Sequence, residues 1–283
     1  MSSPTRSAQR DLNDAKGLLF RCLLLMAATF CQLSCAGGPD SVFGDLDGQI
    51  TDVTIIAGGR TRAVATVIPD ADSVSPQTFS VFAGFGDADE ISDEAEIVVE
   101  DGRLTIDVRR VEERLRRDIG ISLSVRDLQS IEFDGVGYGE LIGRDPPNLI
   151  KVSGGAAVEA KRVGTKDTEH IRLTVEDSTF GGTIAVGRFE VVGTNAGLPI
   201  RGVSRELSMT LIGSTQTGGS IGGEDSTEID LVRSHVRSVC ALGPLRIDAK
   251  EESTLAYRPR CLPDDVVPLI EADETSEVSE IDF

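Results

Sequence analysis

Few side chains in this sequence could perform catalysis. Only two histidines are present, His170 and His235, so a hydrolytic triad or a histidine-rich metal site has little to draw on. Serines are numerous, but none is expected in the elbow between a strand and a helix that exposes a nucleophile. We therefore predict no catalytic residue and no cofactor, and we expect that the protein is not an enzyme.

Two acidic segments could in principle carry other chemistry. Glu224 with Asp225, or Asp87 with Asp89, could form the carboxylate pair of a glycosidase. Sugar-binding sites also favour stacking aromatic side chains, however, and aromatic residues make up only 4% of the chain. Gly222-Gly223-Glu224-Asp225 and the segment 84–90 are similar to calcium loops, yet the nonapeptide calcium repeat is absent. Solvated turns are the simpler interpretation of both segments, and we predict no metal site.

The first 35 residues have the composition of a secretory signal peptide. Four basic residues precede an uncharged run of 15 residues from Cys22 to Ala36, shorter than the ~20 residues that cross a bilayer. Leu33-Ser34-Cys35-Ala36 resembles the lipobox of bacterial lipoproteins, in which Cys35 would be lipidated. Gln32 departs from that pattern, and a plain cut after Ala36 is the alternative. We predict export to the cell envelope, with residues 36–48 as a linker.

The charge of the chain limits its partners. The formal net charge is −19, and it falls to −21 once the four basic and two acidic residues of the leader are removed. A surface this acidic is repelled by phosphate backbones and by anionic lipids. We therefore expect no nucleic acid as a partner, and contact with a membrane only through the lipid on Cys35.

A repeated unit fills the second half of the chain and predicts the fold. Apolar residues alternate with polar ones, and Gly-rich steps such as Gly181-Gly182 and Gly218-Gly219 are expected at the corners between strands. Successive units are 18 to 22 residues long, which suits one coil of a β-solenoid. The predicted unit starts are Leu149, Ile171, Phe189, Leu207, Ile229 and Ile247.

We predict one all-β domain, a single parallel β-solenoid over residues 49–261. Residues 42–140 are interpreted as its irregular opening coils, with a helical turn or a loop at Val111 to Asp118. Residues 262–283 contain many carboxylates and no basic residue, and we expect a disordered acidic tail there.

The two cysteines outside the leader segment match the repeat. Cys240 and Cys261 are 21 residues apart, close to one coil, and adjacent coils stack at about 4.8 Å, within reach of a disulfide. In an oxidising compartment we expect the bond to join the last coil to its neighbour, with two buried free thiols as the alternative.

Several segments resemble a known family. Asp101 to Ile106, Ile121 to Val125 and Leu128 to Gly135, followed by steps such as Val152-Ser153-Gly154-Gly155, are similar in order and spacing to the family named "putative auto-transporter adhesin, head GIN domain". The resemblance covers residues 50–260. The Arg-rich insertion at 109–117 departs from it. The resemblance implies an exported β-solenoid with an adhesion or binding role and transfers no catalytic residue.

The function predicted from the sequence is therefore non-enzymatic binding at the cell envelope, with an unidentified protein or glycan as ligand. Two alternatives remain open at this stage: a polysaccharide-active β-helix enzyme, since that architecture also hosts lyases and hydrolases, and a purely structural stacking module.

Overall fold

The protein, seen in a computed structural model, is built almost wholly from β-strands. The structure describes residues 41–46, 49–68, 76–83, 88–116, 118–165 and 168–281, so the predicted signal peptide and Cys35 lie outside the described residues. From the N-terminus, the elements are β1 Ser41–Asp45, β2 Asp52–Ile56, β3 Thr61–Ile68, β4 Thr78–Ala83, α2 Ala88–Glu94, β5 Glu96–Glu100, β6 Arg103–Asp107, α3 Arg109–Leu115, β7 Ile119–Arg126, β8 Ser130–Asp134, β9 Tyr138–Ile142 and β10 Leu149–Ser153. The remaining elements are β11 Ala157–Val163, β12 His170–Glu176, β13 Thr179–Thr194, β14 Ile200–Ile212, β15 Thr215–Gln216, β16 Ile221–Val232, β17 His235–Val239, β18 Leu245–Lys250, β19 Thr254–Tyr257, the 3₁₀ turn η1 Pro259–Cys261, β20 Leu269–Ala272 and β21 Glu277–Glu280.

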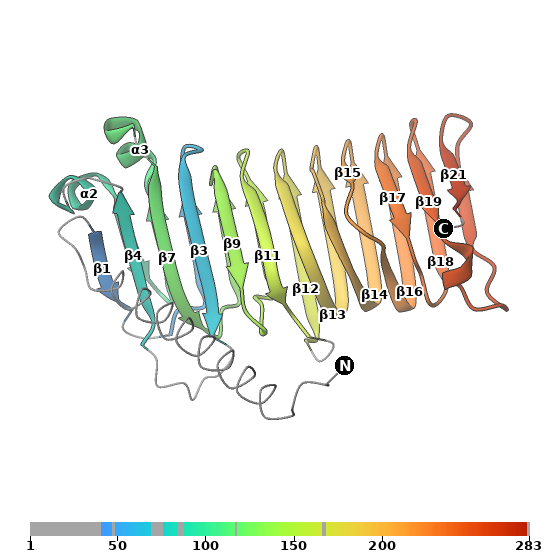
Figure 1. Cartoon of the computed structure of the whole chain (residues 1–283), viewed down its shortest axis with the longest axis horizontal. Helices are drawn as coiled ribbons and strands as arrows, with labels where there is room; N and C mark the ends of the chain where they lie inside the picture. Colours follow the sequence, from blue (N-terminus) through green and yellow to red (C-terminus); the bar gives the residue numbers. More distant parts are fainter. Residues whose placement is uncertain are drawn as a thin grey trace, which may run out of the picture.

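The strands form two parallel ladders that share one core. The first ladder contains, in spatial order, β6, β2, β8, β10 and β12, the second halves of β13, β14 and β16, and then β18 and β20. The second ladder contains β7, β3, β9 and β11, the first halves of β13 and β14, and then β15, β17, β19 and β21. The chain winds from one ladder to the other, so the predicted parallel β-solenoid is confirmed (Figure 1).

The predicted unit starts agree with the observed register in two stretches and are displaced in two others. Ile171 pairs with Phe189 and Phe189 with Leu207, while Ile229 pairs with Ile247. Leu149, however, pairs with Arg172. Leu207 pairs with Thr227 and not with Ile229, and the register also shifts by one residue at Glu224-Asp225 of β16. A bulge adds residues to one strand without moving its partner, and spacing alone does not reveal it.

The order of the first coils along the axis differs from their order in the sequence. β2 and β3 lie between the coil of β6 and β7 and the coil of β8 and β9. Figure 1 shows this as the blue β3 standing between the green β7 and β9. Beyond β7, β4 and β1 pair in antiparallel fashion, and β5 pairs antiparallel to β6. Residues 41–45, predicted to be linker, thus form a strand of the array.

The Arg-rich insertion of the sequence is the helix α3, and a buried carboxylate fastens it to the solenoid. Glu112 accepts hydrogen bonds from the N–H of Gly58, from the N–H of Arg60 at 2.9 Å and from the hydroxyl of Thr61 at 2.6 Å. Its side chain and that of Val111 lie in the interior. The helix and the antiparallel strands therefore close the N-terminal end of the sheet, where an open edge would pair with other chains.

Serines mark four of the corners where a coil passes from the first ladder to the second, while glycines mark earlier ones such as Gly154-Gly155. Ser178, Ser214, Ser234 and Ser253 are all buried there. Each hydroxyl accepts the N–H of a residue one coil earlier, as from Ser214 to Ser234 at 3.1 Å and from Ser234 to Ser253 at 3.2 Å. We call these residues the corner serine ladder.

The residues just before these serines adopt positive φ, as predicted for corners, but most are not glycine. They are Asp177, Gly213, Arg233 and Glu252, and Asn195 has the same conformation before Ala196. The predicted corner glycines Gly181 and Gly182 lie within β13 instead.

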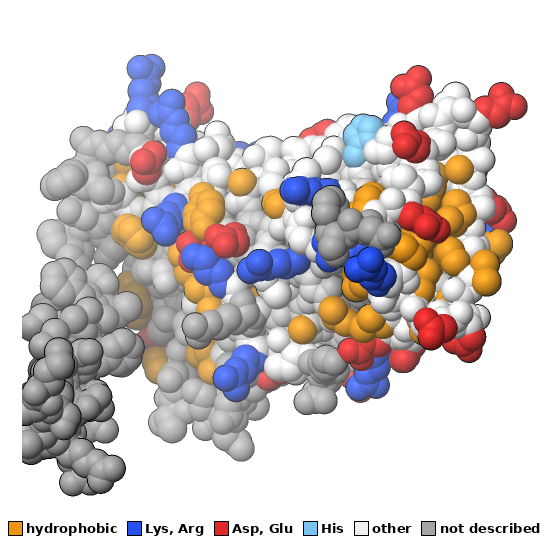
Figure 2. All heavy atoms as spheres, turned by 45° about the vertical axis from the view of Figure 1, so that its right-hand side comes forward, with side chains coloured by type: hydrophobic (Ala, Val, Ile, Leu, Met, Phe, Trp, Pro, Cys, Tyr) orange, Lys and Arg blue, Asp and Glu red, His pale blue; other side chains and the backbone are white. Residues whose placement is uncertain are grey.

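The prediction of a disordered acidic tail is wrong. After η1 the chain forms one more coil, in which β20 pairs in parallel with β18, and β21 with β19. Ile270 stacks on Ile247, and Val278 stacks on Leu255. A coil needs only a few inward apolar residues, so the many outward carboxylates of this segment obscured its alternation of apolar and polar residues. The solenoid therefore runs past residue 261 to Glu280, and Figure 2 shows hydrophobic side chains exposed at this end.

Candidate functional site

The histidines that the sequence offered for catalysis do not meet. His170 opens β12 in the first ladder, where its Nε2 lies 3.7 Å from an oxygen of Glu190. His235 opens β17 in the second ladder, and its Nδ1 lies 2.8 Å from the hydroxyl of Thr254. Each imidazole thus contacts its neighbouring coil, as expected of a polar residue on a solenoid face.

Two other candidate groups lie on β16 or just before it, and Asp87 lies outside the described residues. Gly218 to Gly222 match the Gly-x-Ser-x-Gly pattern, but Ser220 leads into the strand β16 and its hydroxyl contacts that of Ser238 at 3.1 Å. Glu224 and Asp225 lie side by side in the bulge of β16. Within the described ranges, no cluster of three or more His, Cys, Asp and Glu residues could hold a metal ion.

The two cysteines outside the leader lie at disulfide distance. The sulfur atoms of Cys240 and Cys261 are 2.02 Å apart and their Cα atoms 5.3 Å apart. Cys261 belongs to η1 and not to a strand, and β20 and β21 follow it. The pair therefore joins the penultimate coil to the one before it, whereas the sequence placed it at the last coil.

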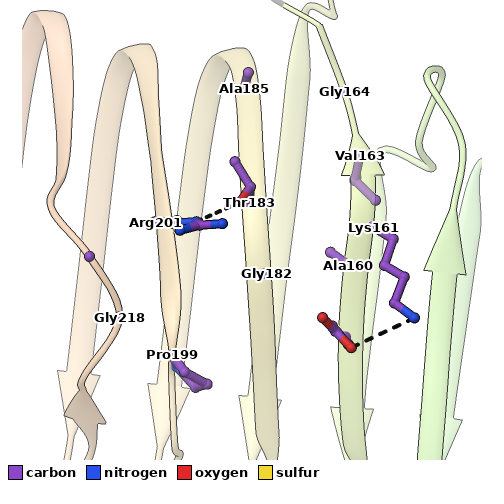
Figure 3. A pocket seen from close by; sticks show the side chains of 12 residues that line it. Ala160, Lys161, Val163, Gly164, Gly182, Thr183, Ala185, Pro199, Arg201 and Gly218 are labelled. Atoms are coloured by element: carbon purple, nitrogen blue, oxygen red, sulfur yellow. Dashed lines mark hydrogen bonds and ion pairs between the residues drawn. The ribbon is translucent and has the colours of Figure 1, made fainter. Parts of the chain in front are cut away.

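The structure adds a site that sequence reasoning missed, a shallow groove on the outer face of the second ladder. It encloses about 680 Å³ and crosses β11, β13, β14 and the segment before β16. Its floor is made by glycines, among them Gly164, Gly182 and Gly218, and Lys161 and Arg201 stand beside it (Figure 3).

The close stacking of the coils explains the glycines in the floor. Gly182 has a φ of +125°, and a Cβ atom on it would lie 2.2 Å from the carbonyl oxygen of Ala160. A Cβ atom on Gly218 would lie 2.0 Å from the carbonyl oxygen of Ile200. Only glycine fits at these positions, since no side chain can enter the space that the neighbouring backbone fills. The groove lies where these side chains are missing.

Arg201 is the most distinctive group in the groove. Its Nε donates to the hydroxyl of Thr183 at 2.8 Å, which orients the guanidinium across the strands. Among the described residues no carboxylate forms an ion pair with it, whereas Arg172 and Arg188 each face a glutamate in the next coil. The two terminal nitrogens of Arg201 thus remain available for a carboxylate, sulfate or phosphate, which a guanidinium binds with two parallel hydrogen bonds.

Lys161 belongs to a charged network at the edge of the groove. Its Nζ lies 3.0 Å from Oε1 of Glu140, which is also 3.4 Å from Nη2 of Arg62. The bond from Lys161, with smaller contributions from Tyr138 and Arg62, holds the pKa of Glu140 below its ordinary value. The hydroxyl of Tyr138 donates to Glu159 at 2.8 Å, and this bond raises the pKa of Tyr138. Lys161 is therefore neutralised locally, and Arg201 is not.

The sequence contained one signal of this groove, the paired glycines at 181–182 and 218–219, which we interpreted as corners. Their spacing is two coils, so they stack across the face with Pro199 between them. The register that places Arg201 next to Thr183 depends on the paired strands and could not be read from spacing.

Comparison with known proteins by sequence finds no relative. No protein-family model matches the chain, and no curated protein matches it. The predicted membership of the head GIN domain family therefore stays a prediction.

Among the described residues, none of the helices has the length and apolar character needed to span a membrane.

Comparison by structure finds similar folds in solved structures. A "putative adhesin" from Parabacteroides merdae has a TM-score of 0.58 at 10% identity, covering 87% of this chain and 98% of its own. A "putative lipid binding protein" from Parabacteroides distasonis has a TM-score of 0.56 at 12% identity, with the same coverage of 87% and 98%. A "putative adhesin" from Parabacteroides distasonis gives 0.53 at 12% identity, again with 87% and 98% covered. At these identities the comparison establishes a shared fold alone.

Proposed function

We propose that this protein is a non-enzymatic binding protein of the cell envelope and that the groove of the second ladder is its ligand-binding surface. The observation that carries the proposal is Arg201, a guanidinium without an ion-pair partner in the described part of the chain, held by Thr183 beside a glycine floor. The names of the structures with this fold, adhesins and a lipid-binding protein, are in keeping with a binding role.

The charge of the protein restricts the ligand that this groove takes. With a net charge of −19, the protein repels a densely anionic polymer at long range. Arg201 can still accept one carboxylate on an otherwise neutral chain, because the interaction is short-ranged and bidentate. The ligand is therefore an extended molecule with isolated carboxylates, and either a glycan or a protein segment could supply them.

Matched probes test the proposal. Binding to sialyllactose is compared with binding to lactose, and binding to an extended peptide with one aspartate is compared with the same peptide carrying asparagine. We expect one of the two carboxylate probes to bind, Arg201→Gln to weaken that binding about tenfold or more, and Arg201→Lys to restore part of it. Arg110→Gln, on α3 at the far end of the solenoid, is the control and leaves binding unchanged.

Three results would contradict the proposal. Equal binding of the charged and neutral probes would show that Arg201 does not recognise a carboxylate. Binding that survives Arg201→Gln would show that the site lies elsewhere. Turnover of a glycan probe would favour the alternative of a polysaccharide-active enzyme.

We propose further that Cys35 anchors the protein to the membrane as a lipoprotein. The lipobox-like segment Leu33 to Ala36 and the short apolar run before it support this. Intact mass of the membrane fraction should show an acylated chain that begins at Cys35, and Cys35→Ala should release a soluble protein. A soluble wild-type protein cut after Ala36 would remove the anchor from the proposal.

A further inference from the structure

The two ends of the solenoid are built differently. At the N-terminal end, α2, α3 and antiparallel strands lie over the first coils. At the C-terminal end, β20 pairs only with β18, and β21 only with β19, among the described strands. The outer edges of β20 and β21 therefore present unpaired N–H and C=O groups, which are a template for an added strand.

Apolar side chains surround this open edge. Val267, Leu269 and Ile270 are 88%, 54% and 37% exposed, although Ile270 occupies the same inward position as the buried Ile247 of the previous coil. Val278, which stacks on the buried Leu255, is only partly covered. Figure 2 shows hydrophobic side chains gathered on the C-terminal end, which is turned forward, with Asp and Glu side chains around them. The edge thus has the apolar surface that a further coil would cover.

The last coil carries acidic side chains and no basic ones. No Lys or Arg follows Arg260 in the sequence, while Glu271, Glu274 and Glu277 lie exposed on the last coil. Glu280 occupies an inward position above Tyr257 and accepts a hydrogen bond from its hydroxyl at 2.6 Å. A carboxylate at an inward position blocks the addition of an ordinary apolar coil, because its charge would be buried without a partner.

This charge disfavours a second copy as the occupant. If two C-terminal ends met, Glu271 and Glu280 of each copy would face those of the other. If the C-terminal end of one copy met the N-terminal end of another, the carboxylates would meet Glu96 and Glu100 of the edge strand β5. On the edge strands, both arrangements place like charges within a strand spacing of about 4.8 Å, which is repulsive. Two arginines of α3 at the N-terminal end, Arg109 and Arg114, are already paired with Asp107 and Glu94.

We propose that the outer edges of β20 and β21 are a docking site for an extended basic segment of another protein, which adds one strand to β20, turns at the corner and adds a second strand to β21. Its main chain pairs with the free edge, its apolar side chains cover Ile270 and Val278, and its lysines or arginines pair with Glu271, Glu277 and Glu280. The site is separate from the groove at Arg201 and does not depend on the function proposed for it.

A designed peptide of twelve residues, the length of the segment 269–280 that it would cover, tests the proposal. It alternates lysine with valine, and its partner peptide carries glutamate in place of lysine. We expect the lysine peptide to bind the purified protein, and hydrogen exchange to show new protection of amides within residues 269–280. The glutamate peptide should not bind.

Charge-reversal variants make the test specific. Glu271→Lys with Glu277→Lys should weaken the lysine peptide about tenfold or more and allow the glutamate peptide to bind. Glu113→Lys, an exposed change on α3, is the control and should have no effect. No binding by the lysine peptide, or protection outside residues 269–280, would overturn the proposal. Concentration-dependent self-association that protects these same amides at neutral pH would show that a second copy is the occupant, and it would overturn the proposal as well.

Discussion

Ser214 donates its backbone N–H to the hydroxyl of Ser234, one coil further along the solenoid, at 3.1 Å. Ser234 also donates from that hydroxyl to the carbonyl of Val232 at 2.8 Å, so one buried side chain satisfies two backbone groups of the corner. Backbone groups in a corner have no strand partner, and each one left unpaired in the interior destabilises the fold. The corner serine ladder therefore completes the hydrogen bonding that the two strand ladders begin.

Replacing Ser234 with alanine should lower the free energy of unfolding by about 1–3 kcal/mol, because the N–H of Ser214 and the carbonyl of Val232 would lose a partner without access to water. Urea unfolding followed by circular dichroism measures the change. Ser208→Ala, on the outward face of β14, should cost less than about 0.5 kcal/mol. Equal effects of the two variants would show that the corner bonds do not contribute to stability.

Glu112→Ala should detach α3 from the solenoid. The change removes the buried acceptor for the N–H groups of Gly58 and Arg60 and for the hydroxyl of the buried Thr61. We expect a loss of about 2–3 kcal/mol in the free energy of unfolding and faster amide exchange at residues 57–61. Glu113→Ala, the exposed neighbour, is the matched control. Unchanged exchange at residues 57–61 in Glu112→Ala would contradict this assignment.

Removal of the bond between Cys240 and Cys261 should loosen the C-terminal coils. The bond closes a loop of 21 residues, which is worth about 3 kcal/mol in the chain-entropy model. The double change Cys240→Ser with Cys261→Ser should speed amide exchange in β18 and β19 more than in β12. A reducing agent should have the same effect on the wild-type protein and none on the double variant. Detection of free thiols at Cys240 and Cys261 in the exported wild-type protein would show that the disulfide does not form.

Alanine variants of Gly182 and Gly155 distinguish two energetic costs of replacing glycine, backbone strain and steric clash. Both have positive φ, but a Cβ atom on Gly155 would meet nothing within 4 Å, while one on Gly182 would meet the oxygen of Ala160 at 2.2 Å. We expect Gly155→Ala to cost about 1 kcal/mol from backbone strain, and Gly182→Ala to cost about 2 kcal/mol more from the clash. Similar costs in chemical denaturation would mean that the coils can move apart at the groove.

The last coil should loosen in acid. Hydrogen bonds from the N–H of Glu251, and from Ser276 and Thr275, lower the pKa of Asp273 to about 2 from an ordinary value of 3.8. A depressed pKa means that the folded state prefers the charged form. Its contribution is therefore complete above the ordinary value and is lost as the pH falls through 3.8 toward 2. Amide exchange in β20 should accelerate over this range in the wild-type protein and not in Asp273→Asn.

The parallel solenoid could be predicted from the sequence because period-two alternation and a regular coil length are local properties of the chain. The positions of Ile171, Phe189 and Leu207 repeat one unit, and strands that repeat in this way stack with their apolar side chains in register. The proximity of Cys240 and Cys261 followed from the same period.

Only the tertiary structure decided the order of the first coils, the last coil and the groove. The position of β2 between β6 and β8 depends on pairing across distant segments, which no local pattern records. The last coil was hidden because charge content describes the outward residues, while stacking depends on a few inward ones such as Ile270. Arg201 became a candidate only when the register placed it next to Thr183, since a side chain's lack of an ion-pair partner is a property of neighbours in space.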